Sequence, residues 1–325
     1  MEARGDLGTR AIAKTRRAIL AFSDVSLAER VAERLPDTFH VVHSSPSEGR
    51  DALWEGRMAG TVVFAHIRHA EMIFGSALTP VPGAESAALS ACPPIVFVTG
   101  DSAPGEYFHL IARYGIARFL HPRFLNDARM LASLLEGVFE GTRRHDLSHY
   151  CESDEPICRE AVRDAAARLD AIDRICEAAA RRFGADYQVT EHRLAVEELL
   201  NNALFHAFHD AHEEPREASS RPRPLGENEE VAVEYLADER LFAFSVTDSG
   251  GRLTGDIVRR EINRQFSGEG LLQAHGRGVF LTFSFANAFI LNSIPGRLSQ
   301  VVVAFYRRLH SDCKMFQINA SPMTL

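Results

Sequence analysis

The sequence predicts an α/β protein of two domains, the first built on a doubly wound parallel sheet. A chain of 325 residues holds about two domains of ~150 residues each. From Arg17 to about Gly141, short β-branched runs alternate with amphipathic runs, which indicates βαβ units. We therefore expect a first domain at 1–141, a linker at 142–155, a second α/β domain at 156–310 and a tail at 311–325.

The composition is that of a soluble globular protein, with 46% hydrophobic and 25% charged residues. A formal net charge of −8 offers no general positive field for phosphate backbones, so we expect protein or small-molecule partners and no direct nucleic acid. The apolar run at 18–22 is too short for a signal peptide, and no apolar stretch approaches ~18 residues. These features predict a cytoplasmic protein without a membrane segment.

The cysteines are odd in number and form no C-x-x-C pair, which is typical of scattered reduced thiols. They are Cys92, Cys151, Cys158, Cys176 and Cys313. We expect them to be packing residues.

In the first domain, strand-like and helix-like runs follow one another regularly. We expect strands at 18–22, 39–44, 61–67, 93–101 and 117–122, and helices at 26–35, 107–115 and 125–141.

The second domain is expected to begin with a long helix from Ile157 to Phe183. Apolar residues recur along it in steps of four and three: Ala165, Leu169, Ile172, Cys176, Ala179 and Phe183. Gly184 is placed to end this helix, and Thr190 is placed to cap the next one. Strands are expected at 231–237, 241–248, 287–294 and 298–308, whereas the polar segment at 209–230 reads as an exposed loop.

The stretch at 195–208, AVEELLNNALFHAF, is the most specific feature of the chain. It places Glu198, Asn202 and His206 at successive i, i+4 steps, so one helical stripe carries a carboxylate, an amide and an imidazole. A helix built only to pack would fill this stripe with leucine or alanine. The stripe therefore indicates a binding or catalytic role.

Three further stretches follow this helix in order. VTDSGGRL at 246–253 ends a predicted strand, GRGVFL at 276–281 opens a helix-like run, and PGRLSQVVVAF at 295–305 contains a closing strand. With the helix, they resemble the nucleotide-binding boxes of the GHKL ATPase superfamily, and the helix most resembles that of anti-sigma-factor serine kinases. The resemblance implies a GHKL (Bergerat) α/β sandwich that binds ATP and Mg²⁺.

The resemblance also implies roles for the helical stripe. The amide of Asn202 would bind Mg²⁺, which prefers oxygen ligands. Glu198 would lie near the γ-phosphate as the catalytic base, and His206 would be a further cofactor contact.

The glycine-containing boxes would hold the rest of the nucleotide. In the resemblance Asp248 accepts a hydrogen bond from the adenine amino group, and Gly250 leaves room for the base. The free N–H groups of the second glycine box would cradle the phosphates, and a hydroxyl of the closing strand would face the nucleotide. These residues are Gly276, Arg277, Gly278 and Ser299.

Two features depart from the pattern of active kinases. Arg252 stands where the second glycine of the Asp-x-Gly-x-Gly box is expected, and it could crowd the base pocket or contact a phosphate. The lid segment at 254–275 is poor in glycine: after Gly255 at its start it contains only Gly268 and Gly270. Catalysis and passive nucleotide binding therefore both stay open.

The first domain is similar in layout to a response-regulator receiver, which has a flavodoxin-like fold. His66 stands where the phosphoacceptor aspartate is expected, Asp24 is the remaining acidic residue, and His121 replaces the lysine before a proline. Thr99 matches the switch residue. We therefore expect a receiver-like scaffold without phosphotransfer, used for docking or dimerisation.

These features together predict a regulator in signal transduction or transcription. It would phosphorylate a serine on a protein partner, or sequester that partner, which would be a sigma factor, an anti-anti-sigma-like protein or another regulator. One alternative is a non-catalytic scaffold. The other is a sensor histidine kinase, in which His145 and the two residues after it would form the phosphoacceptor box. The series His206, His209 and His212 invites a metal-site hypothesis, but it drifts around a helix end, so a solvated helix end is the preferred interpretation.

Overall fold

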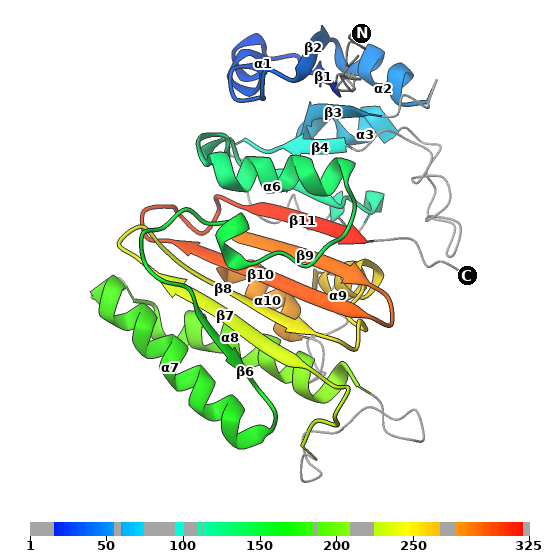
Figure 1. Ribbon diagram of the computed structural model, residues 1–325. Helices are drawn as coiled ribbons and strands as arrows, with labels where there is room; N and C mark the ends of the chain where they lie inside the picture. The colour runs from blue at the N-terminus through cyan, green and yellow to red at the C-terminus, as the bar shows by residue number, and fades with distance from the viewer. Residues whose placement is uncertain are drawn as a thin grey trace, which may run out of the picture.

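One sheet runs through both halves of the chain (Figure 1). The computed structural model describes residues 16–54, 60–74, 95–100, 110–111, 113–184, 187–208, 224–266 and 277–320. Within these residues the sheet has eleven strands, in the order β2-β1-β3-β4-β5-β11-β9-β10-β8-β7-β6. Their bounds are β1 (Arg16–Ala21), β2 (Phe39–Ser44), β3 (Thr61–His66), β4 (Ile95–Val98), β5 (Arg118–Leu120), β6 (Cys158–Ala161), β7 (Val231–Ala237), β8 (Leu241–Asp248), β9 (Ala288–Ile294), β10 (Leu298–Tyr306) and β11 (Met315–Ala320).

The first five strands are parallel and confirm the strands expected from the sequence. Parallel strands bury both faces, so they appear as continuous apolar runs. In β1, Ala18 and Leu20 enter one core while Ile19 and Ala21 enter the other.

The helices of this half are α1 (Val25–Ala32), α2 (Pro46–Trp54), α3 (Ala70–Phe74) and α6 (Ala128–Phe139), with short 3₁₀ turns η1 (Ile67–His69) and η2 (Pro122–Asn126). Aspartates begin two of them: the side chain of Asp24 accepts from Leu27 N at the start of α1, and that of Asp127 accepts from Met130 N at the start of α6. The expected helices at 26–35 and 125–141 are thus confirmed with tighter bounds. Of the helix expected at 107–115, residues 110–111 and 113–114 are helical, whereas 107–109 and 112 lie outside the described residues.

The strands from β6 to β10 are antiparallel. Helices α7 (Ala165–Phe183), α8 (Val189–Asn201), α9 (Gly255–Phe266) and α10 (Arg277–Phe285) share an apolar core with one face of the sheet, whereas α1 and α6 share a core with the other. Each core contains residues from both halves of the chain. The boundaries at 141 and 156 stay predictions.

The long helix expected from Ile157 begins eight residues later, so its predicted start is wrong. Asp164 caps α7 by accepting from Ala167 N at 2.8 Å, and residues Cys158–Ala161 instead form the edge strand β6 beside β7. Leu169, expected in the apolar seam, is 48% exposed. Gly184 ends the helix with a φ of 54°, as expected.

The next helix also begins differently from the prediction. Helix α8 starts at Val189, and Thr190 lies inside it, so Thr190 is not the cap. Gln188 occupies the cap position without a side-chain hydrogen bond.

The tail at 311–325, for which the sequence indicated no element, contributes a strand to the middle of the sheet. Strand β11 pairs antiparallel with β5 and parallel with β9, so it joins the two halves (Figure 1). Buried Lys314, just before it, donates from Nζ to the carbonyl oxygens of Phe283 at 3.0 Å and Ala286 at 2.7 Å. Lys314 thus satisfies carbonyls at the end of α10 that the helix itself leaves without partners.

The polar segment expected as a linker is folded against the sheet. It contains the 3₁₀ turn η3 (Leu147–His149), and its residues Leu147, Tyr150 and Cys151 are buried against the face that α6 covers. We call residues 142–155 the connector.

The cysteines that the structure describes, namely Cys151, Cys158, Cys176 and Cys313, are all free, as expected, and Cys92 lies outside the described residues. Among the described residues, no helix combines the length and apolar character needed to cross a membrane.

Candidate functional site

Helix α8 carries the acid and the amide that the sequence singled out. Ala195, Val196 and Leu199, on the buried side of the helix, pack in the core and fix the helix against the sheet. Glu198 and Asn202 are partly exposed and lie one turn apart. The core side of the helix therefore determines where both polar groups are presented.

The helix changes pitch directly after Asn201. Residues Asn202–His206 form a π-helical turn, η5, which holds more residues per turn than an α-helix. The predicted stripe assumed regular α-helical spacing, so it does not continue unchanged to His206, and His206 is exposed. Its role as a cofactor contact stays a prediction without support from this placement.

The second glycine box lies against Glu198. A Cβ atom on Gly278 would lie 2.2 Å from Oε2 of Glu198 and 2.8 Å from its Cβ, so a side chain there would displace the acid. Burial raises the pKa of the Glu198 carboxyl, and the neighbouring Glu197 carboxylate raises it further. A carboxylate of raised pKa is suited to accept a proton near neutral pH.

Asp248 ends β8 as a buried carboxylate, only 5% exposed. Its Oδ1 accepts from Gly250 N at 3.0 Å and from Gly251 N at 2.9 Å. Burial raises the pKa of Asp248 from 3.8 to about 6, and these two N–H bonds together with the Ser299 hydroxyl oppose that rise. The protein thus keeps a carboxylate where ionisation is unfavourable, which is a common property of functional groups.

The two glycines after Ser249 meet different neighbours. A Cβ on Gly250 would lie 2.0 Å from the carbonyl oxygen of Ala207, so only glycine fits against the backbone that follows η5, and its role beside adenine stays a prediction. Gly251 has a φ of 62°, and a Cβ there would lie within 2.6 Å of three backbone atoms of the β9–β10 hairpin. Sequence reasoning passed over Gly251, although the Gly-Gly pair itself marks a tight turn.

Ser299 lies beside Asp248 in the register of β10 and β8. It is buried, and its Oγ accepts from Leu253 N at 3.1 Å. The serine therefore fixes the segment that leaves the Asp-x-Gly box.

The remaining predicted residues are placed as follows. Arg252 is exposed, so its guanidinium does not plug the interior of the site. Arg277 begins α10 and is partly exposed. Gly276 and most of the second half of the lid segment, at 267–275, lie outside the described residues.

Contacts between neighbours link the sequence motifs into one site. Gly278 meets Glu198, Gly250 meets the chain just after η5, and Ser299 pairs with Asp248. The set fits Mg-ATP: Asn202 offers an amide oxygen to a hard cation, Asp248 offers a buried acceptor, and the second residue of α10, Gly278, stands where any side chain would intrude.

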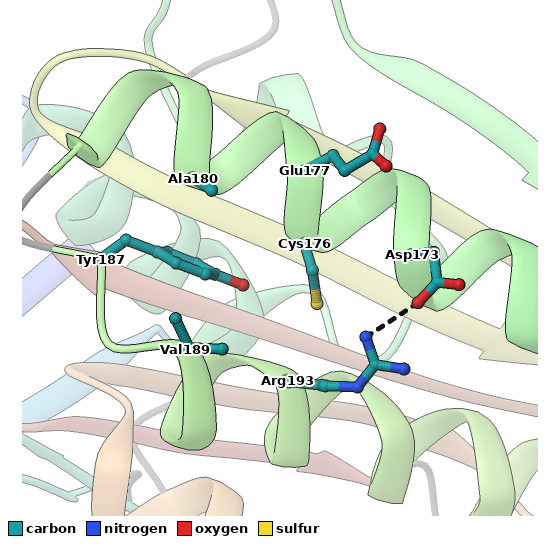
Figure 2. Close-up of a pocket in the computed structure, with 7 residues that line it drawn as sticks. All are labelled: Asp173, Cys176, Glu177, Ala180, Tyr187, Val189 and Arg193. Atoms are coloured by element: carbon teal, nitrogen blue, oxygen red, sulfur yellow. Dashed lines mark hydrogen bonds and ion pairs between the residues drawn. The ribbon is translucent and has the colours of Figure 1, made fainter.

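A separate hollow of about 230 Å³ lies between α7 and α8 (Figure 2). It is lined by Asp173, Cys176, Glu177, Ala180, Tyr187, Val189 and Arg193. Arg193 bridges Asp173 and Glu197, at 2.8 Å to each. None of the predicted nucleotide residues lines this hollow, so it is not part of the site above.

In the N-terminal half, the four residues compared with a receiver line one cavity of about 500 Å³: Asp24, His66, Thr99 and His121. The Nδ1 atom of His66 accepts from Arg68 N at 3.1 Å, and that of His121 accepts from Arg123 N at 3.2 Å. Both imidazoles therefore begin short turns after their strands. Burial, followed by the nearby Arg68 charge, lowers the pKa of His66 to about 4.

Comparison with known proteins agrees with the C-terminal site. A search of curated proteins found no match to this chain. Residues 162–303 match the family model described as the histidine kinase-like ATPase domain. The matched range runs from just before α7 into β10, and it includes Glu198, Asn202, Asp248 and Ser299. This match supports a GHKL-like, ATP-binding regulatory domain in residues 162–303.

Proposed function

We propose that this chain is a cytoplasmic signalling regulator that binds Mg-ATP and phosphorylates a serine on a protein partner, or sequesters that partner, in a partner-switching circuit. The contact of Gly278 with Glu198 carries the proposal, because it joins the second glycine box to the acid-bearing helix. The resemblance of the helix at 195–208 to anti-sigma-factor serine kinases supports the choice of substrate.

Each polar group has a chemical role in this proposal. Asn202 would hold Mg²⁺, and Asp248 would accept from the adenine amino group. Bound Mg-ATP would supply the phosphoryl group to the serine hydroxyl, whose oxygen bonds to phosphorus as the bond to the ADP oxygen breaks. Glu198 would take the hydroxyl proton, while positioning and charge neutralisation supply most of the rate.

The N-terminal half would act as a receiver-like, flavodoxin-like scaffold for docking or dimerisation. The parallel order β2-β1-β3-β4-β5 and the cavity beside His66 support this role. No phosphoryl transfer is assigned to it, because His66 and His121 stand where the receiver chemistry needs an aspartate and a lysine. The partner would be a sigma factor, an anti-anti-sigma-like protein or another regulator.

Glu198→Gln should lower serine phosphorylation about 100-fold while leaving the affinity for Mg-ATP within about threefold, because general-base help contributes about 10²–10⁴-fold. Pull-down of the partner followed by phosphosite mapping provides the substrate, and the rate of phosphoserine formation is then measured for each variant.

Glu197→Gln is the matched control, since Glu197 is the adjacent carboxylate and is paired with Arg193. It should keep the transfer rate within about threefold of the wild type, because burial, the larger cause of the raised pKa of Glu198, is unchanged. Full transfer by Glu198→Gln would show that the base is misassigned. A wild-type chain that millimolar Mg-ATP does not stabilise would instead favour the non-catalytic scaffold, since a ligand at a hundred times its Kd adds about 2.7 kcal/mol.

A further inference from the structure

Three metal-ligand side chains meet on the face of the sheet opposite the nucleotide residues. They are Glu136 of α6 and His145 and His149 of the connector. The Nε2 atom of His145 lies 3.9 Å from Oε1 of Glu136, and that of His149 lies 3.4 Å from Oε2. All three ligand atoms lie within 4.8 Å of one another.

The surrounding structure holds the backbone of both histidines in place before any ion binds. Gln300 of β10 clamps the backbone of His145, accepting from its N at 3.2 Å and donating to its O at 2.7 Å. His149 ends the turn η3, which is anchored where Leu147 N donates to the buried carboxylate of Glu234 at 2.7 Å. Ligands that are already ordered lose little conformational entropy on binding.

The separations approach those of a zinc site. Zinc bonds nitrogen and carboxylate oxygen at about 2.0–2.2 Å, so neighbouring tetrahedral ligands lie about 3.4 Å apart. A carboxylate and two imidazoles also leave one position open, and all three side chains are only 20–28% exposed. Rotation of one imidazole and a shortening of these separations would bring all three groups onto one ion.

The two rings lie side by side against the same carboxylate. The imidazoles of His145 and His149 stack with centroids 4.0 Å apart and an angle of 14° between their planes. Because an imidazole binds a metal in the plane of its ring, one ring must turn out of the stack for both Nε2 atoms to reach one ion, whereas an ion pair with Glu136 uses only one ring. A divalent metal uses both rings in the neutral form and satisfies the carboxylate as well.

We propose that Glu136, His145 and His149 form a binding site for a divalent transition metal, with zinc the best-suited ion, which fastens the connector to α6. Ser299 and Gln300 follow one another in β10, and consecutive residues of a strand point to opposite faces. The metal site and the Ser299 hydroxyl beside Asp248 therefore lie on opposite faces of β10.

Zinc titration of the full chain, stripped of metal by a chelator and free of any affinity tag, tests the proposal by calorimetry. The wild type should bind one equivalent at this site and should show a zinc-dependent rise in Tm. The double variant His145→Ala/His149→Ala should lose that equivalent and the rise in Tm, and Glu136→Gln should weaken binding more than about tenfold. His310→Gln is the matched control, because His310 pairs with Asp312 at 3.0 Å and is not one of the three clustered ligands, so this variant should bind zinc as the wild type does.

X-ray absorption by zinc bound to the wild type tests the ligands without any substitution. It should show only nitrogen and oxygen neighbours at about 2.0–2.2 Å. A sulfur shell at about 2.3 Å would assign the ion to cysteines and overturn the proposal. Zinc binding that is absent in the wild type, or unchanged in the double histidine variant, would overturn it equally.

Discussion

Asp248→Asn should abolish measurable ATP binding and at the same time make the protein more stable at pH 8. Asparagine can keep the two N–H bonds from Gly250 and Gly251, because both are accepted by one oxygen, Oδ1. Asparagine has an NH2 group in place of the second carboxylate oxygen. This group donates hydrogen bonds, so it would face the adenine amino group, which is also a donor. Placing a donor against a donor in a buried site should weaken binding by at least about 100-fold.

The gain in stability follows from the raised pKa of Asp248. The Asp248 carboxyl has a pKa of about 6 in the folded state and a pKa near 3.8 in the unfolded state. Between these values the folded state holds more protons, so wild-type stability falls as pH rises from about 4 to about 6 and stays low above that. The difference amounts to about 3 kcal/mol in free energy of unfolding, and asparagine removes it.

Urea unfolding of both proteins at pH 4.5 and pH 8 measures the stability effect, and calorimetric titration with Mg-ATP measures affinity. Asp238→Asn is the matched control, because the Oδ1 atom of Asp238 likewise accepts from the N–H groups two and three residues later, at the other end of β8. It should leave ATP affinity unchanged. Wild-type ATP affinity in Asp248→Asn would remove Asp248 from the nucleotide site.

Gly251→Ala should destabilise the fold by at least about 4 kcal/mol. The positive φ of 62° alone costs a residue with a side chain about 1–2 kcal/mol. The added methyl would also lie 2.4 Å from Arg297 N and 2.5 Å from Ile294 O, and backbone atoms of a paired hairpin cannot move aside as a flexible side chain can. Strain of this kind belongs to the few mechanisms that produce very large effects.

Gly296→Ala, in the same hairpin, separates the destabilisation caused by a positive φ from that caused by steric crowding. Gly296 has a φ of 71°, but apart from its own atoms and those of its two chain neighbours, no atom of the described residues lies within 4 Å of where its Cβ would be. It should therefore lose only about 1–2 kcal/mol. Chemical unfolding gives both values, and equal losses at the two positions would mean that steric crowding at Gly251 contributes nothing.

The arrangement of the sheet suggests how the two halves of the chain affect each other. The nucleotide residues and the three proposed metal ligands lie on opposite faces of the C-terminal strands, and β10 contributes to both. Strand β11 joins β9 to β5 of the N-terminal half. Movement of one half would therefore displace β11, which is hydrogen-bonded to strands of both halves.

Much of the local structure followed from the sequence. Strand and helix periods depend on the residues of each segment alone, so strands such as 39–44 and 241–248 were predicted with their observed bounds. The acid and amide on one helix, and the buried aspartate ending a strand, also required only local spacing. The ATPase-like half could thus be predicted from its motifs.

The failures share a physical cause, which is that distant partners decided the outcome. Residues Cys158–Ala161 look helical by pattern, but β7 offers an unpaired edge that makes them a strand. Residues Met315–Ala320 of the tail become a central strand because β5 and β9 flank a place for them. The π-helical turn that shifts His206 and the Ala207 carbonyl that fills the space beside Gly250 are likewise set by packing.

The sequence by itself determined the order of elements and the chemical groups of the nucleotide site, since these depend on short-range spacing. Only the tertiary structure decided that Gly251 lies at a positive φ against the β9–β10 hairpin, and that a glutamate of α6 meets two connector histidines. Such contacts join residues that no periodic pattern relates. They form because burying both faces of one continuous sheet brings those segments together.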